Sequence, residues 1–105
     1  MELTVVYGYG ESTELISNHS TEQQIKDLMN RLDWSQFTNV LLSIDDVNWI
    51  SVGGSLGEDG LSIIYSERGE QFVSDIPPDS VEQMTKVLLS YLNQDDQFKK
   101  DWKFI

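Results

Sequence analysis

The feature that most constrains the fold is a pair of strand-like segments joined by a tight turn. The first segment, Asn48 to Leu56, alternates apolar Ile50 and Val52 with small or polar residues. The turn Gly57-Glu58-Asp59-Gly60 follows, and the second segment runs from Leu61 to Ser66. The Asp59-Gly60 pair of the turn supplies the positive φ angles that short hairpin turns require. Because strands joined by a tight turn pair antiparallel, the middle of the chain predicts an antiparallel hairpin.

Other segments extend this hairpin into a sheet. β-Branched and aromatic residues favour strands, whereas Gly, Pro, Asp and Asn interrupt them. A second turn, Glu67-Arg68-Gly69-Glu70, leads out of the hairpin. By these criteria the additional strands are residues 3–7, 15–16, 40–44 and 71–76. Strands that follow one another through tight turns predict an antiparallel β-meander.

Two segments have the 3.6-residue period of amphipathic helices. The first spans residues 21–32, where Ser20 and Gln23 have the spacing of a capping box. The second spans residues 79–92 and begins after Pro77-Pro78. We expect both helices to pack on one face of the sheet, so the fold class is α+β and residues 1–105 form a single domain.

The apolar content is sufficient for one core. Leu, Ile, Val and Phe account for 31 of the 105 residues, well above the roughly 20% below which chains tend to be disordered. The tail, residues 93–105, carries Phe98 and Trp102 and is therefore expected to dock on the domain. The residues expected to be buried include Leu28, Leu32, Trp34, Met84, Leu88 and Leu92.

Charge limits the classes of partner. The chain has 18 acidic and seven basic residues, a formal net charge of −11, so direct binding to nucleic acid or to an anionic membrane is not expected. Residues 36–78 contain seven of the acids, with Arg68 as their only base. A basic protein is the partner that this charge favours. Since the first residues lack a secretory signal pattern and no apolar run could span a membrane, we expect a cytoplasmic location.

No residue pattern indicates catalysis. The chain has no cysteine, which excludes thiolate chemistry and cysteine-ligated metals. The only histidine, His19, lies in a polar stretch and is expected to be solvated. Asp45-Asp46 and Asp95-Asp96 match turns and helix ends better than a Ca²⁺ loop. The glycines of residues 53–57 lack the Lys-Ser/Thr ending of a phosphate loop and fit a bent strand. We therefore expect no enzyme activity, no metal and no cofactor.

Trp49 and the acidic turns are the candidate partner-binding residues. The strand face of Trp49 otherwise carries Ser51, Gly53 and Ser55, which are too small to bury an indole completely. Half-exposed aromatic residues are common in protein interfaces. Alternate turns of a meander lie at one end of the sheet, so the acids of two turns should cluster there, with Glu58 and Asp59 at the other end. The predicted set is Asp45, Asp46, Trp49, Glu67 and Glu70, with Glu58 and Asp59 as second choice.

The order of these parts resembles a known protein family. The segment from Trp49 to Tyr65, the turn at Gly69 and the sequence Ile76-Pro77-Pro78-Asp79 lead into the second helix, and Asp101-Trp102 comes late in the chain. Over roughly residues 40–105 this order resembles immunity family one of bacterial polymorphic-toxin systems. The resemblance implies a cytoplasmic protein that binds and blocks a toxin domain acting on nucleic acid, a nuclease or a deaminase, with no catalytic residues of its own.

The charge is consistent with that function, because a domain that acts on nucleic acid needs a basic cleft that an acidic blocker can occupy. Two alternatives remain: a generic acidic adaptor domain, and an inhibitor that mimics DNA. A DNA mimic would carry acids regularly spaced along helices, whereas both predicted helices are mixed in charge. The sequence does not choose between a monomer and a weak dimer.

Overall fold

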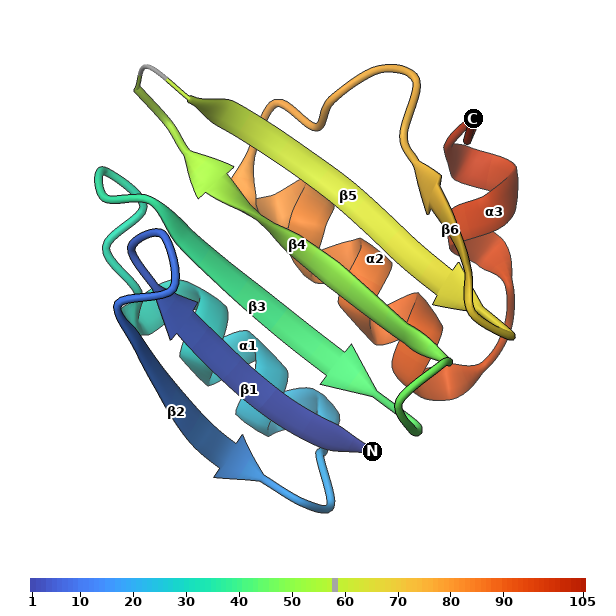
Figure 1. Cartoon of the computed structure of the whole chain (residues 1–105), viewed down its shortest axis with the longest axis horizontal. Helices are drawn as coiled ribbons and strands as arrows, with labels where there is room; N and C mark the ends of the chain where they lie inside the picture. The colour runs from blue at the N-terminus through green and yellow to red at the C-terminus, as the bar shows by residue number, and fades with distance from the viewer. Residues whose placement is uncertain (58) are drawn as a thin grey trace.

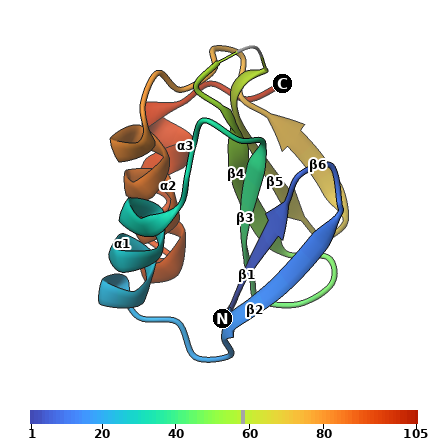
Figure 2. The same ribbon diagram turned by 90° about the vertical axis from the view of Figure 1, so that its left-hand side faces the viewer.

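The computed structural model, which describes residues 1–57 and 59–105, contains one antiparallel sheet with helices on a single face (Figures 1 and 2). The predicted α+β class is confirmed. The strands are β1 Glu2–Tyr7, β2 Ser12–Ser17, β3 Thr38–Ser43, β4 Trp49–Ser55, β5 Gly60–Glu67 and β6 Glu70–Val73. The helices are α1 Glu22–Arg31, α2 Val81–Asn93 and α3 Gln97–Asp101.

The strand order, β2-β1-β3-β4-β5-β6, departs from a simple meander at the N-terminal hairpin. Strands β3 to β6 follow one another as predicted, but β1 lies between β2 and β3, and α1 carries the chain back across the sheet (Figure 1). The apolar content of the two strands explains the order. Leu3 and Val5 of β1 are fully buried, as suits a strand with a neighbour on each side, whereas residues 12–15 of β2 are exposed at the sheet edge.

The core lies between the sheet and the helices. Alternate residues along each strand point to the same face, and the residues facing the helices are buried. Those with no exposed surface in β1, β3, β4 and β5 are Leu3, Val5, Val40, Leu42, Ile50, Val52 and Ile63. The helices contribute Ile25, Met84 and Leu88, which are also fully buried. Within the described residues, no helix covers the opposite face of the sheet (Figure 2).

The start of α1 corrects one sequence prediction. The N-cap is Thr21, one residue after the predicted Ser20, and Thr21 forms a complete capping box with Gln24 rather than Gln23. The Thr21 Oγ1 accepts from the Gln24 amide at 3.2 Å, and the Gln24 Oε1 accepts from the Thr21 amide at 3.0 Å. Ser20 does not cap the helix because its hydroxyl donates to the Met1 carbonyl at 2.8 Å. That bond ties the helix entry to the N-terminus.

Four of the six residues predicted to be buried are buried: Leu28, Trp34, Met84 and Leu88. Leu32 and Leu92 are only partly buried, so the prediction was wrong for these two. Leu32 is the C-cap of α1 and has already turned into extended backbone. Leu92 lies in the last turn of α2, next to Tyr91, which occupies the buried stripe.

The tail docks as predicted, and it does so by pairing with the sheet edge. Val73 and Ile105 exchange backbone hydrogen bonds of 3.1 and 2.9 Å, and Ser74 bridges to Phe104. Phe98 of α3 is buried and contacts the ring of Tyr65 edge to face, with centroids 5.3 Å apart. The C-terminal residues therefore cover the edge of β6.

Candidate protein-binding face

The uncovered side of the sheet carries a row of side chains that crosses every strand. Strand pairing places residues that are partners in the register on the same face. Starting from β2, this register joins Leu15, Thr4, Leu41, Ser51, Ile64 and Val73. Together with Val6 and Trp49 we call these residues the open face. Leu15 and Val73, at the two ends of the row, are 53% and 42% exposed.

Trp49 stands beside this row. Its register neighbours are Ser43 on β3 and Ser66 on β5, which are small side chains, and Trp49 remains half-buried. It borders an open hollow of about 380 Å³ whose apolar lining is Val6, Leu41, Trp49 and Ile64. The other lining residues are polar and uncharged. This combination of an aromatic anchor and aliphatic neighbours is typical of the centre of a protein interface.

The two acidic turns lie at one end of the sheet, where they were predicted. The Gly69 amide donates to the Val47 carbonyl at 3.0 Å, and the Arg68 amide donates to the Asn48 Oδ1 at 2.9 Å. The connection between β4 and β5, to which Asp59 belongs, lies at the opposite end of the sheet (Figure 1). Glu58 lies outside the described residues.

Asp45 holds the β3–β4 loop together. One oxygen of its carboxylate, Oδ1, accepts from the Val47 amide at 2.9 Å and from the Asn48 amide at 2.8 Å. The Asn48 side-chain amide also donates to it at 3.0 Å. These hydrogen bonds hold the pKa of Asp45 below its usual value, and the bond from the Val47 amide is the largest cause. Asp45 therefore organises the loop from which Asp46 projects.

The lowered pKa of Asp45 predicts an acid-dependent loss of stability. In the unfolded chain the carboxyl titrates near its ordinary pKa of 3.8, and in the folded chain it titrates lower. Its stabilising contribution is therefore complete above the unfolded pKa and is lost as the pH falls through the folded one. We expect Asp45→Asn, which keeps one carbonyl acceptor, to reduce the drop in urea stability between about pH 5 and about pH 3. Parallel stability curves for wild type and variant would contradict a lowered pKa of Asp45 in the folded chain.

Glu67 and Glu70 lie on the side of the helices, away from Trp49. Glu67 and Glu70 pair with each other, and Ser66 pairs with Trp49; adjacent positions of a strand point to opposite faces. The sequence prediction grouped Glu67 and Glu70 with Trp49 as candidate partner-binding residues, whereas the strand pairing places these two acids on the opposite face from Trp49. Asp46 and Glu70 have no side-chain hydrogen bond or ion pair within the part of the chain that the structure describes.

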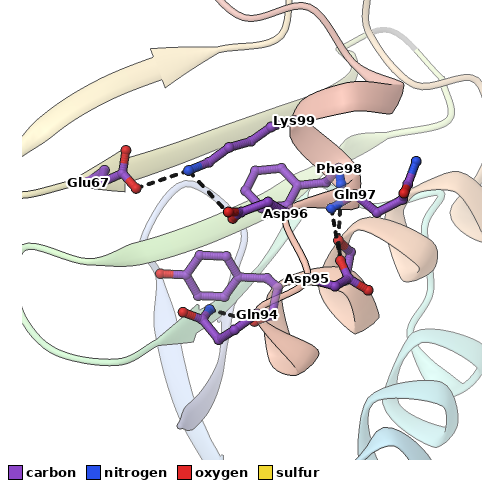
Figure 3. Close-up of polar contacts among 9 residues, drawn as sticks. Glu67, Gln94, Asp95, Asp96, Gln97, Phe98 and Lys99 are labelled. Atoms are coloured by element: carbon purple, nitrogen blue, oxygen red, sulfur yellow. Dashed lines mark hydrogen bonds and ion pairs between the residues drawn. The ribbon is translucent and has the colours of Figure 1, made fainter.

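Lys99 of α3 neutralises Glu67 (Figure 3). Its Nζ lies 3.0 Å from Glu67 Oε1 and 3.6 Å from Asp96 Oδ1. It also lies 5.5 Å from the centre of the Tyr65 ring. Burial lowers the pKa of Lys99, but the hydrogen bond and charge of Glu67 outweigh burial, so that the pKa is raised overall. The Glu67 carboxylate is thus paired within the protein itself.

The net charge is concentrated in the sheet half of the molecule. The sheet and its loops, residues 1–20 and 36–78, contain ten acids and one base. The helical layer, residues 21–35 and 79–105, contains eight acids and six bases. Most of the negative charge therefore belongs to the sheet and its loops, and the helical layer is close to neutral.

The aliphatic residues of the open face were not singled out from the sequence. Leu41 lies between Val40 and Leu42 in a continuous apolar run, and Ile64 follows Ile63. Such runs are typical of strands buried on both sides. Leu41 and Ile64 are seen to face outwards only because both helices pack on the other side of the sheet. The prediction of two helices on one face was therefore the one feature of the sequence analysis that could have identified them.

Other kinds of site are not indicated by the described residues. In residues 1–57 and 59–105, no three His, Asp or Glu side chains are grouped so that they could hold a metal ion. Within the same residues, no helix has the length and apolar character needed to cross a membrane. Comparison with family models, with curated proteins and with solved structures finds no match.

Proposed function

We propose that this chain is a non-catalytic inhibitor of the immunity type, which binds a basic toxin domain through its open face. The observation that carries the proposal is an uncovered, aromatic-anchored sheet face in the acidic half of the molecule. Its resemblance in the order of strands, turns and helix to immunity family one supports the same function. We place the encounter in the cytoplasm, where a toxin acting on nucleic acid would have to be blocked.

The size of the open face suits such a partner. A stable protein interface buries about 800 Å² on each partner. The molecule measures 30 by 29 Å along its two longer axes, so one side of the sheet provides an area of that order. A face built on paired strands can present this area without rearrangement of the backbone.

The distribution of charge supplies a mechanism. A domain that holds DNA or RNA presents a basic cleft, and the acidic sheet half attracts that cleft over several ångströms in solution. The contact itself then depends on the apolar side chains of the open face, including Trp49, which become desolvated in the complex. Charge accelerates the encounter, and the apolar contacts set the lifetime of the complex.

The same geometry argues against a mimic of DNA. The centre of the open face is lined by aliphatic and aromatic residues, whereas a DNA mimic would present carboxylates at regular spacing. A generic adaptor would have the same surface, and the experiment below separates it from an inhibitor.

The test is protection of cells from the protein encoded beside this chain, which the proposed function requires to carry a toxin domain. We expect co-expression of this chain to restore growth of cells that express that domain, and not of cells that express unrelated toxin domains. The purified chain alone should leave DNA, RNA, nucleotides and peptides unchanged. Binding without protection would favour the adaptor, and turnover of any of these substrates would refute the proposed function.

A further inference from the structure

A second surface feature is a cavity of about 450 Å³ at the end of the sheet opposite the Asp45 loop. It lies where the β1–β2 turn, the segment before β3 and the β4–β5 turn come together (Figure 1). Its volume falls within the range of about 300 to 1,000 Å³ that ligand pockets occupy. The described residues that characterise its chemistry are Tyr7, Tyr9, Glu11, Phe37 and Asp59.

Stacked aromatic rings form one wall of this cavity. The rings of Tyr9 and Phe37 have centroids 4.4 Å apart and an interplanar angle of 20°. Tyr9 is nevertheless 74% exposed, so a large part of its surface faces solvent. Two hydrogen bonds fix the stack: the Gly8 amide donates to the Phe37 carbonyl at 2.9 Å, and the Tyr9 hydroxyl donates to Asp59 Oδ1 at 2.9 Å. The exposed ring is therefore held in place before any partner binds.

Two carboxylates complete the cavity. Asp59 is held by Tyr9 and by the Ser55 hydroxyl, which donates to Asp59 Oδ2 at 3.1 Å. Glu11 folds back over Gly8, where a Cβ would come within 2.9 Å of the Glu11 carboxyl carbon. Gly8, with φ of +61°, thus leaves the space that the Glu11 carboxylate occupies. Among the described residues that line this cavity there is no Lys or Arg.

We propose that this cavity receives an arginine side chain presented by the basic partner. A guanidinium is planar and permanently charged, so it can stack on an aromatic ring while it donates to carboxylates beside that ring. Tyr9 provides the ring, and Glu11 and Asp59 provide the acceptors. A lysine ammonium would meet the same charge without the planar stacking. In naming the partner's side chain, the inference rests on the proposed function.

A titration with Nα-acetyl-arginine amide tests the cavity without the partner. We expect amide resonances of Tyr9, Glu11 and Phe37 in the full ¹⁵N-labelled chain to shift in a saturable way, with a dissociation constant of about 1–10 mM. Nα-Acetyl-citrulline amide has nearly the same shape but no charge, and should leave these resonances in place. Equal shifts with both compounds, or no shift with the arginine compound, would overturn the inference.

A matched pair of variants tests whether the carboxylate of Glu11, rather than the net charge of the chain, binds the arginine compound. Glu11→Gln should weaken the arginine titration about threefold, as expected for the loss of one exposed ion pair. Glu2→Gln removes the same charge from the other end of β1 and should leave the titration unchanged. Equal effects of the two variants would show a response to net charge only and would also overturn the inference. Because the arginine titration does not involve Trp49, unchanged toxin binding in Trp49→Ala together with the expected arginine titration would mean failure of the proposed function alone.

Discussion

Replacement of Gly54 by alanine is expected to lower the free energy of unfolding by about 3 kcal/mol or more. Gly54 has φ of +118°, a conformation that residues with a side chain rarely adopt. A Cβ at this position would also lie 1.9 Å from the Gly60 carbonyl oxygen on the paired strand. Since the obstacle is backbone, no side-chain rotation can relieve it. The β4–β5 pairing would have to separate locally, and urea denaturation should report the loss.

Gly57→Ala is the matched control for this substitution. Gly57 lies three residues later, and a Cβ there would meet no atom within 4 Å. Its substitution should change the unfolding free energy by no more than about 0.5 kcal/mol. If both variants had the stability of wild type, the described approach of β4 to β5 at Gly54 would be wrong.

Leu88→Ala is the second substitution with a large expected effect. Leu88 of α2 has no exposed surface and belongs to the core between this helix and the sheet. Removal of a buried leucine side chain leaves a cavity and typically costs about 3 kcal/mol. Leu89, the next residue, is only partly buried, so Leu89→Ala should cost clearly less. Equal losses of unfolding free energy in the two variants would contradict the described orientation of α2.

Elements that depend on neighbours in the sequence could be predicted from it. The Gly57–Gly60 turn joins strands that pair with each other, and the apolar spacing around Leu28 and Leu88 places both helices against the core. The insertion of β1 between β2 and β3 was not predicted. It depends on the pairing of residues 2–7 with residues 38–43, and no local pattern specifies such a distant partner.

The candidate site was only partly predictable for a similar reason. Asp45 and Glu67 were chosen for their charge, but the charge alone does not show that Asp45 bonds its own loop or that Glu67 pairs with Lys99. Both contacts depend on where the backbone brings donors. Trp49 was predicted from the small residues on its strand face, and its position on the open face agrees with that pattern; its binding role stays a prediction.

The affinity of the proposed toxin partner for the Trp49→Ala variant tests the central claim most directly. Calorimetric titration should show a loss of about thirtyfold or more, because Trp49 is the aromatic anchor of the open face. Trp102→Ala, which removes the same side chain from the α3 side, is the matched control and should bind within about twofold of wild type once circular dichroism shows that both variants are folded. Unchanged affinity in Trp49→Ala, or an equal loss in both variants, would contradict binding through the open face.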